Sequence, residues 1–133
     1  MDQKVQEQRD AANKFLESGE LKTATTYSYD CMVSVGGGFL NVDFKKGASK
    51  VAQFSGGFGG GGAYTGWGTA WCNKPVESMK GKSAGFTVEI IGILGGVAHV
   101  QIIAASDNFI SGCSAAGIGI GIIGIGGGAG KFS

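Results

Sequence analysis

A chain of 133 residues with 43% hydrophobic and 16% charged residues is long enough for one globular domain and too apolar to be intrinsically disordered. Eleven basic residues nearly balance ten acidic ones. The net charge of +1 excludes the broad positive field that attracts nucleic acid or anionic lipid, so we expect no nucleic-acid partner.

The first predicted element is an amphipathic helix over residues 2–18. Val5, Ala12, Phe15 and Leu16 fall on one side at helical spacing, and Lys, Gln, Glu and Arg occupy the other side. A glycine follows directly after the last apolar position, where it can end the helix. The sequence therefore predicts a surface helix with a narrow apolar stripe.

After this helix the apolar period changes from 3.6 to 2, which indicates β-strands. The clearest strand runs from Tyr27 to Val35 and ends at three consecutive glycines. Alternation and turn residues predict further strands over residues 40–44, 51–55, 63–71, 84–90, 97–104, 108–115 and 117–125. The polar segment 73–82, which contains the single proline, is expected to be an exposed loop.

The eight strands imply an all-β fold with one short N-terminal helix. Because no crossover helices separate the strands, we expect an antiparallel system that hides its edges by closing into a barrel or folding into a sandwich. The boundaries are residues 1–24 for the helix and connector and residues 25–133 for a glycine-rich β-barrel, in a single domain overall.

Glycine marks one face of several predicted strands. Of the 27 glycines, 26 follow residue 35, and near the end of the chain Ile118, Ile120 and Ile122 alternate with glycine. Such a strand has one bulky face and one bare face, and the bare face lets a neighbouring element approach closely. This pattern favours a tightly wound small barrel.

The uncharged stretch 108–130 is also long enough to raise the question of a membrane-spanning helix. Its alternation of glycine and isoleucine is typical of a strand instead, and we interpret it as a buried strand. A membrane-active toxin or pore-forming protein, in which residues 109–125 insert into lipid, remains an alternative.

No set of residues predicts catalysis. His99 shares a strand face with Val97 and Gln101, and no carboxylate stands at a strand-compatible offset from it, so we expect a structural histidine. Cys113 does not lie in a motif of the GxSxG type, which forms the sharp turn between a strand and a helix that exposes a catalytic nucleophile. The run GGFGGGG precedes a strand, whereas a phosphate loop precedes a helix. We therefore expect a protein that is not an enzyme, without catalytic residues and without a cofactor.

The cysteine count bears on metal and redox chemistry. Cys31, Cys72 and Cys113 are widely spaced, and one histidine is too little to complete a structural zinc site with them. We expect no metal and three buried thiols, although one disulfide with a free thiol is also open. A small-ligand binder that uses His99 or Cys113 is a second alternative function.

The candidate interaction surface combines Trp67 and Trp71 with Val5 and Phe15 of the predicted helix. The two tryptophans share a face of the predicted strand 63–71, but no basic residue is interleaved with them as in a base-stacking platform. In a small barrel, paired tryptophans more often fill the core or plug one end, and that is where we expect them.

Two segments, QFSGGFGGGGAYTGWGTAW and GIGGGAGKFS, resemble the virulence-associated (Vap) proteins of an actinobacterial pathogen of horses. The similar positions are Gly56–Gly62, Trp67 with Gly68, and Gly126–Gly128 with Phe132 and Ser133. The resemblance implies a compact, closed eight-stranded antiparallel barrel of two Greek-key halves, with a short helix at one end, no obvious ligand cavity and no catalytic residues to transfer.

The same resemblance implies a function and a location. It implies a non-enzymatic, secreted or host-directed effector or interaction protein with a protein or membrane partner and no small-molecule substrate. The chain departs from the family pattern in its amphipathic N-terminal segment, in its three cysteines, and in opening with polar residues where a secretory signal would be apolar.

Overall fold

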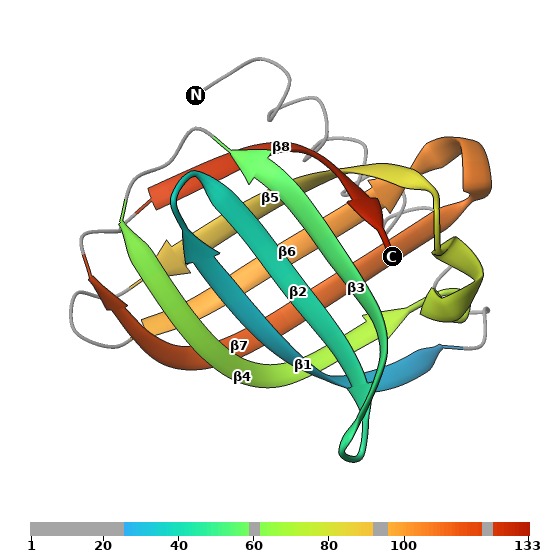
Figure 1. The fold of residues 1–133 in the computed structure, drawn as a ribbon, viewed down its shortest axis with the longest axis horizontal. Coiled ribbons are helices and arrows are strands. Elements are labelled where there is room, and N and C mark those ends of the chain that lie inside the picture. Colours follow the sequence, from blue (N-terminus) through green and yellow to red (C-terminus); the bar gives the residue numbers. More distant parts are fainter. Residues whose placement is uncertain (1–25, 59–61, 92–95, 121–123) are drawn as a thin grey trace.

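The computed structural model describes residues 26–58, 62–91, 96–120 and 124–133, and within these ranges the chain forms a closed eight-stranded antiparallel barrel (Figure 1). The strands are β1 (Tyr27–Gly36), β2 (Phe39–Lys46), β3 (Ser49–Phe58), β4 (Ala63–Cys72), β5 (Ser83–Ile91), β6 (Gly96–Ala104), β7 (Phe109–Ile120) and β8 (Gly124–Phe132). The predicted barrel is confirmed. The predicted helix over residues 2–18, with Val5 and Phe15, lies outside the described residues.

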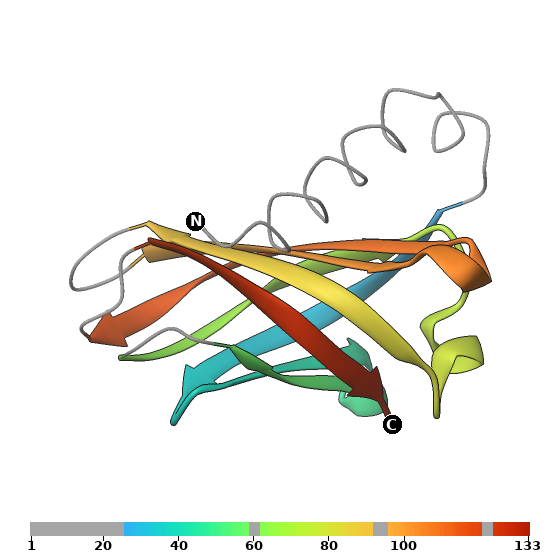
Figure 2. The ribbon, with the colours of Figure 1, turned by 90° about the horizontal axis from the view of Figure 1, so that it is seen from above.

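The strands follow one another around the barrel in the order β1-β2-β3-β8-β5-β6-β7-β4. Each half of the chain has three consecutive strands side by side and its fourth strand beside its first, in the orders β4-β1-β2-β3 and β8-β5-β6-β7. The halves meet where β3 pairs with β8 and β4 pairs with β7. In the flattened barrel, β5, β6 and β7 form one side, and β1, β2 and β3 cross over the other (Figures 1 and 2).

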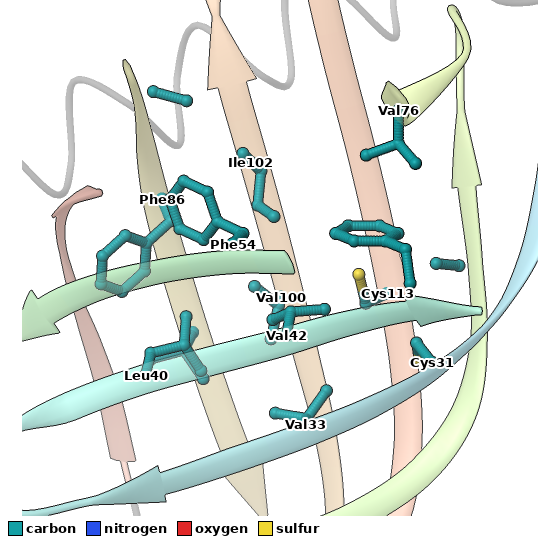
Figure 3. Close-up of a cluster of buried hydrophobic side chains, with 14 of the residues drawn as sticks. Cys31, Val33, Leu40, Val42, Phe54, Val76, Phe86, Val100, Ile102 and Cys113 are labelled. Atoms are coloured by element: carbon teal, nitrogen blue, oxygen red, sulfur yellow. The ribbon is translucent and has the colours of Figure 1, made fainter. Parts of the chain in front are cut away.

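Inward-facing side chains fill the interior, as alternation in β1, β2 and β5 predicts (Figure 3). The ring of Phe132 lies among three other buried aromatic rings, with ring centroids 4.9 Å from Phe54, 5.4 Å from Phe109 and 6.4 Å from Phe44. Each fully buried large apolar side chain contributes about 1.5–3 kcal/mol through the hydrophobic effect. The packed interior is therefore a core, and it holds the strands together.

The predicted boundary between the last two strands is wrong. The sequence predicts a break at Ala116 and a final strand over residues 117–125, whereas β7 continues to Ile120 and β8 runs to Phe132. Gly117 pairs with Gly66 on one side and Gly96 on the other, so the glycine continues the ladder where a turn was expected. The glycine-rich end of the chain is itself the strand that joins β3 to β5.

The segment between β4 and β5 is not simply an exposed loop. It contains a short 3-10 turn, η1 (Val76–Met79), and Val76 and Met79 are buried against the core. The Tyr29 hydroxyl accepts a hydrogen bond from the backbone N–H of Val76 at 3.1 Å and donates one to Glu77 at 2.8 Å. This turn, and not a tryptophan, therefore covers one end of the barrel. A second 3-10 turn, η2 (Ala105–Asp107), joins β6 to β7.

The other end is filled by Tyr64, whose ring packs against bare inner positions. A Cβ atom on Gly66 would lie 2.8 Å from the Tyr64 ring, and one on Gly119 would lie 3.0 Å from it. The Tyr64 hydroxyl donates a hydrogen bond to the carbonyl of Gly96 at 3.0 Å. The predicted bare face of the glycine–isoleucine strand is thus a site of close packing. In the described part of the chain, no helix is long and apolar enough to cross a membrane.

Substitution of Gly119 tests this packing. Gly119→Val should lower the free energy of unfolding by about 1–3 kcal/mol, because the new side chain overpacks against Tyr64. The matched control is Gly36→Val, since a Cβ atom there meets nothing within 4 Å. Urea unfolding of both variants measures the difference, and equal stabilities would mean that the inner face tolerates bulk.

The Tyr29 hydroxyl gives the barrel a defined pH dependence. Burial raises the pKa of Tyr29 to about 12 from its ordinary 10.0. The unfolded chain therefore ionises first, so the contribution of Tyr29 to stability is complete below pH 10.0 and is lost as the pH rises to about 12.

Tyr29→Phe should accordingly flatten the loss of stability in that alkaline window. At neutral pH the variant should be less stable by about 1–3 kcal/mol, because the buried N–H of Val76 loses its acceptor. Urea titrations at neutral pH and at two alkaline values measure both effects. Parallel pH profiles for the variant and the wild type would contradict the role assigned to the hydroxyl.

Candidate interaction surface

Trp67 and Trp71 lie on the outside of the barrel. Trp67 is 59% exposed, so the expectation that the tryptophans fill the core or plug an end is wrong. The inner positions of β4 are Tyr64, Gly66, Gly68 and Ala70. A Cβ atom on Gly68 would run into the backbone carbonyl of Ser114, so the inside has no room for an indole there. The large side chains of β4 consequently point to solvent.

Trp67 belongs to an exposed apolar strip that crosses three strands. In the register of the sheet, Trp67 of β4 is opposite Ala116 of β7, which is opposite Val97 of β6. Ile118 lies two residues further along β7 on the same outer face. Their exposed fractions are 59% for Trp67, 43% for Val97 and 68% for Ile118. We call these four residues the apolar strip.

Polar and acidic residues flank the apolar strip. His99 and Ser114 lie two residues before Val97 and Ala116 on their strands, on the same outer face. On the side of β1, Met32 is opposite both Trp67 and Asp43. These neighbouring residues supply hydroxyl, imidazole and carboxylate groups. None of the residues named here is a lysine or an arginine.

Trp71 does not join the strip. It lies four residues from Trp67 along β4, roughly 13 Å away at strand spacing. Its indole rests on Gly112, where a Cβ atom would approach the ring to 2.6 Å. Trp71 also borders a shallow depression, in which the Lys46 ammonium lies 5.3 Å from the centre of the Tyr29 ring. The tryptophans share a face without forming one stacking platform.

A carboxylate does stand opposite His99, contrary to the sequence analysis. Glu89 of β5 is the direct cross-strand partner of His99, and Ser114 of β7 is its partner on the other side. The Oγ atom of Ser114 lies 2.8 Å from Nδ1 of His99. Glu89, His99 and Ser114 thus form a row across β5, β6 and β7. The sequence of one strand does not reveal its register with the next, so this row could not be identified from the sequence.

The row of Glu89, His99 and Ser114 has the residue types of a catalytic triad but not its surroundings. Nucleophilic hydrolysis needs donors aimed at the developing oxyanion, commonly free backbone N–H groups. Here Ser114 lies mid-strand between β4 and β6, where backbone groups are paired in the ladders, and His99 is exposed on the outer face of the sheet. The arrangement fits a surface hydrogen bond.

The three cysteines are buried free thiols, as expected, and Figure 3 shows two of them, Cys31 and Cys113. The Cys72 thiol lies 3.4 Å from the Ser111 hydroxyl, and burial raises the pKa of Cys72 to about 12. The pKa of Cys113 is raised well above its ordinary value, mainly by the hydrogen bond with Cys31 and secondly by burial. The Cys72 and Cys113 thiols are therefore poor nucleophiles at neutral pH. The hydrogen bond with Cys113 lowers the pKa of Cys31, and the Cys31 thiol is kept from reagents by its burial. Among the described residues, no group of His, Cys, Asp and Glu is arranged to hold a metal ion.

These features define the class as a small closed antiparallel β-barrel with a filled interior and an apolar strip on its outer face. No protein-family model matches the chain, and no curated protein matches it. Among solved structures, the virulence-associated protein VapB from the intracellular pathogen Rhodococcus equi is similar, with a TM-score of 0.59. The two share 19% sequence identity, and the alignment covers 82% of this chain and 98% of VapB. The likeness shows a shared fold.

The burial of the thiols predicts their chemical behaviour. With the native protein at neutral pH, iodoacetamide should leave Cys31, Cys72 and Cys113 unmodified, and in guanidinium chloride it should alkylate all three. Mass spectrometry of the intact protein and of its peptides measures the modification. Rapid alkylation of Cys113 in the native protein would support the small-ligand or thiol-based alternative.

Proposed function

We propose that this protein is a non-enzymatic interaction protein that docks a partner protein through the apolar strip. The observation that carries the proposal is the contiguity of Trp67, Ala116 and Val97 across three strands, beside the exposed Ile118. Large contiguous apolar patches on soluble proteins commonly mark interaction sites, and tryptophan is among the residues that contribute most to binding.

The charges around the strip favour a protein partner over a membrane. Surface binding to anionic lipid uses basic residues beside the apolar side chains. Here the register places the acidic residues Asp30, Asp43 and Glu89 near the strip, and the whole chain has a net charge of +1. The membrane-active alternative therefore has no electrostatic support from this face.

The absence of an enzymatic role is part of the same proposal. It is supported by the unfavourable surroundings of the Ser114–His99 pair and by the burial of the thiols. The aromatic side chains of the core occupy the interior, which disfavours the small-ligand alternative. We accordingly assign no cofactor, no metal and no small-molecule substrate.

The effector version of the proposal rests on the fold. Likeness to the VapB barrel supports a virulence-associated, secreted or host-directed protein, and the strand orders β4-β1-β2-β3 and β8-β5-β6-β7 support the Greek-key type that such a barrel implies. The partner of an effector is then a host protein.

The strip can be tested with two matched variants. Trp67→Ser removes the largest side chain of the strip, and Phe39→Ser removes an equally exposed side chain of β2, since both are 59% exposed. Immobilised wild type and variants are exposed to the same host-cell extract, and captured proteins are quantified by mass spectrometry. We expect a partner that the wild type and Phe39→Ser retain and that Trp67→Ser captures at least tenfold less.

Equal capture by all three proteins, or equal loss in both variants, would contradict the role of the strip. Vesicles of phosphatidylcholine and phosphatidylglycerol provide the membrane arm, through co-sedimentation and dye release at neutral and acidic pH. We expect neither binding nor release. Release that depends on Trp67 would replace the proposal with the membrane-active alternative.

A further inference from the structure

An open depression lies on the outside of the barrel between β1, β2 and β4. Its volume is about 590 Å³, which falls within the range of roughly 300–1,000 Å³ that is typical of small-molecule sites. Trp71 forms part of its wall. The polar side chains that line it are Ser28, Asp30, Lys45, Lys46 and Thr69. None of these residues belongs to the apolar strip.

The depression forms because β2 leaves β1 before β1 ends. The described pairing of β1 with β2 stops at Asp30 opposite Lys45, whereas the pairing of β1 with β4 continues to Tyr27 opposite Cys72. The register of β2 with β3 also shifts after Phe44, and the β2–β3 hairpin extends away from β1 (Figure 1). The start of β1 and the end of β4 are therefore open on the side of the hairpin.

Trp71 supplies a flat apolar surface at the edge of the depression. Its indole packs over Gly112 of β7, where a Cβ atom would come within 2.6 Å of the ring. The side chain is half-buried and stands directly opposite the exposed Ser28 of β1. Because packing already holds the indole in place, a ligand that stacks on it loses little affinity to side-chain ordering. The C–H face of a sugar ring matches such a surface in size and polarity.

A row of polar side chains crosses three strands beside Trp71. Asp30 of β1 is opposite Thr69 of β4 on one side and Lys45 of β2 on the other. Asp30 and Thr69 are exposed, and Lys45 is half-buried. An ionised carboxylate accepts hydrogen bonds from hydroxyl groups, and such charge-assisted bonds are stronger than neutral ones. The row therefore presents both an acceptor and donors to a ligand that is rich in hydroxyl groups.

Lys46 adds a second positive charge to the depression. Its Nζ atom lies 5.3 Å from the centre of the Tyr29 ring, and the Tyr29 hydroxyl is itself held by hydrogen bonds to Val76 and Glu77. The cation–π contact thus positions the ammonium group against a fixed ring. Among the charged side chains that line the depression, two ammonium groups stand against one carboxylate. This balance favours a ligand with a negative charge.

We propose that this depression binds a sugar ring that carries a carboxylate, such as the acidic terminal sugar of a glycan. The ring stacks on Trp71, and its hydroxyl groups donate hydrogen bonds to Asp30. Its carboxylate lies against the ammonium groups of Lys45 and Lys46. The site is separate from the apolar strip, because Trp71 is roughly 13 Å along β4 from Trp67. Either proposal can therefore fail without the other.

NMR titration of the full chain with two matched sugars tests the site. The probes are methyl β-D-glucuronide and methyl β-D-glucoside, in which a hydroxymethyl group replaces the carboxylate. We expect the glucuronide to shift the indole N–H signal of Trp71 and the backbone amide signals of Asp30 and Thr69, and the glucoside to bind at least tenfold more weakly. Absence of these shifts, equal binding of both sugars, or tighter binding of adenosine monophosphate would overturn the proposal.

Two pairs of variants locate the binding site. Trp71→Ala should weaken glucuronide binding at least tenfold, whereas Trp67→Ala, on the same face of β4, should leave it unchanged. If Trp71→Ala does not fold, Lys46→Gln tests the charge against Lys50→Gln, which lies in the same hairpin but does not line the depression. We expect Lys46→Gln to reduce the preference for glucuronide over glucoside at least threefold and Lys50→Gln to retain it. Equal behaviour within the pair that is measured would reject the site.

Discussion

Tyr64 ties three strands together at one end of the barrel. Its ring lies against Gly66 of its own strand and Gly119 of β7, and its hydroxyl donates to the carbonyl of Gly96 of β6. Such contacts require bare inner positions, because a Cβ atom at any close approach would displace the ring or a neighbouring strand. The bulky residues of these strands are then excluded from the inside. The exposure of Trp67 is thus a consequence of tight closure.

The closed barrel keeps its thiol groups on the inside and its exposed apolar residues on the outside. Aromatic rings and thiols occupy the inside, where burial raises the pKa of Cys72 and suppresses its reactivity at neutral pH. The apolar strip, by contrast, lies on the outer face of β4, β6 and β7. On the outer face of β5 to β7, the row of Glu89, His99 and Ser114 lies beside the apolar strip.

Hydrophobic alternation was sufficient to predict the barrel where large apolar side chains mark the inner face, as Val33, Val42 and Phe86 do. It failed at the last two strands, because glycine there removes the side chains that distinguish a strand from a turn. In β4, alternation correctly placed Trp67 and Trp71 on one face and the small residues on the other. It did not show which face is inside, and the tendency of small barrels to bury tryptophan led to the wrong choice. The pairing of Glu89 with His99 depends on register between strands, which no single strand contains.

β8 lies where the two halves of the barrel meet, and this position affects how the protein folds. β8 pairs with β3 on one edge and β5 on the other, and Phe132 completes the aromatic core beside Phe54. Until β8 is synthesised and docked, both half-barrels present open strand edges, which are prone to pair with other chains. Closure also joins residues far apart in sequence, a topology that slows folding. The barrel is therefore most vulnerable to aggregation during its own biosynthesis, before its glycine-rich closing strand is in place.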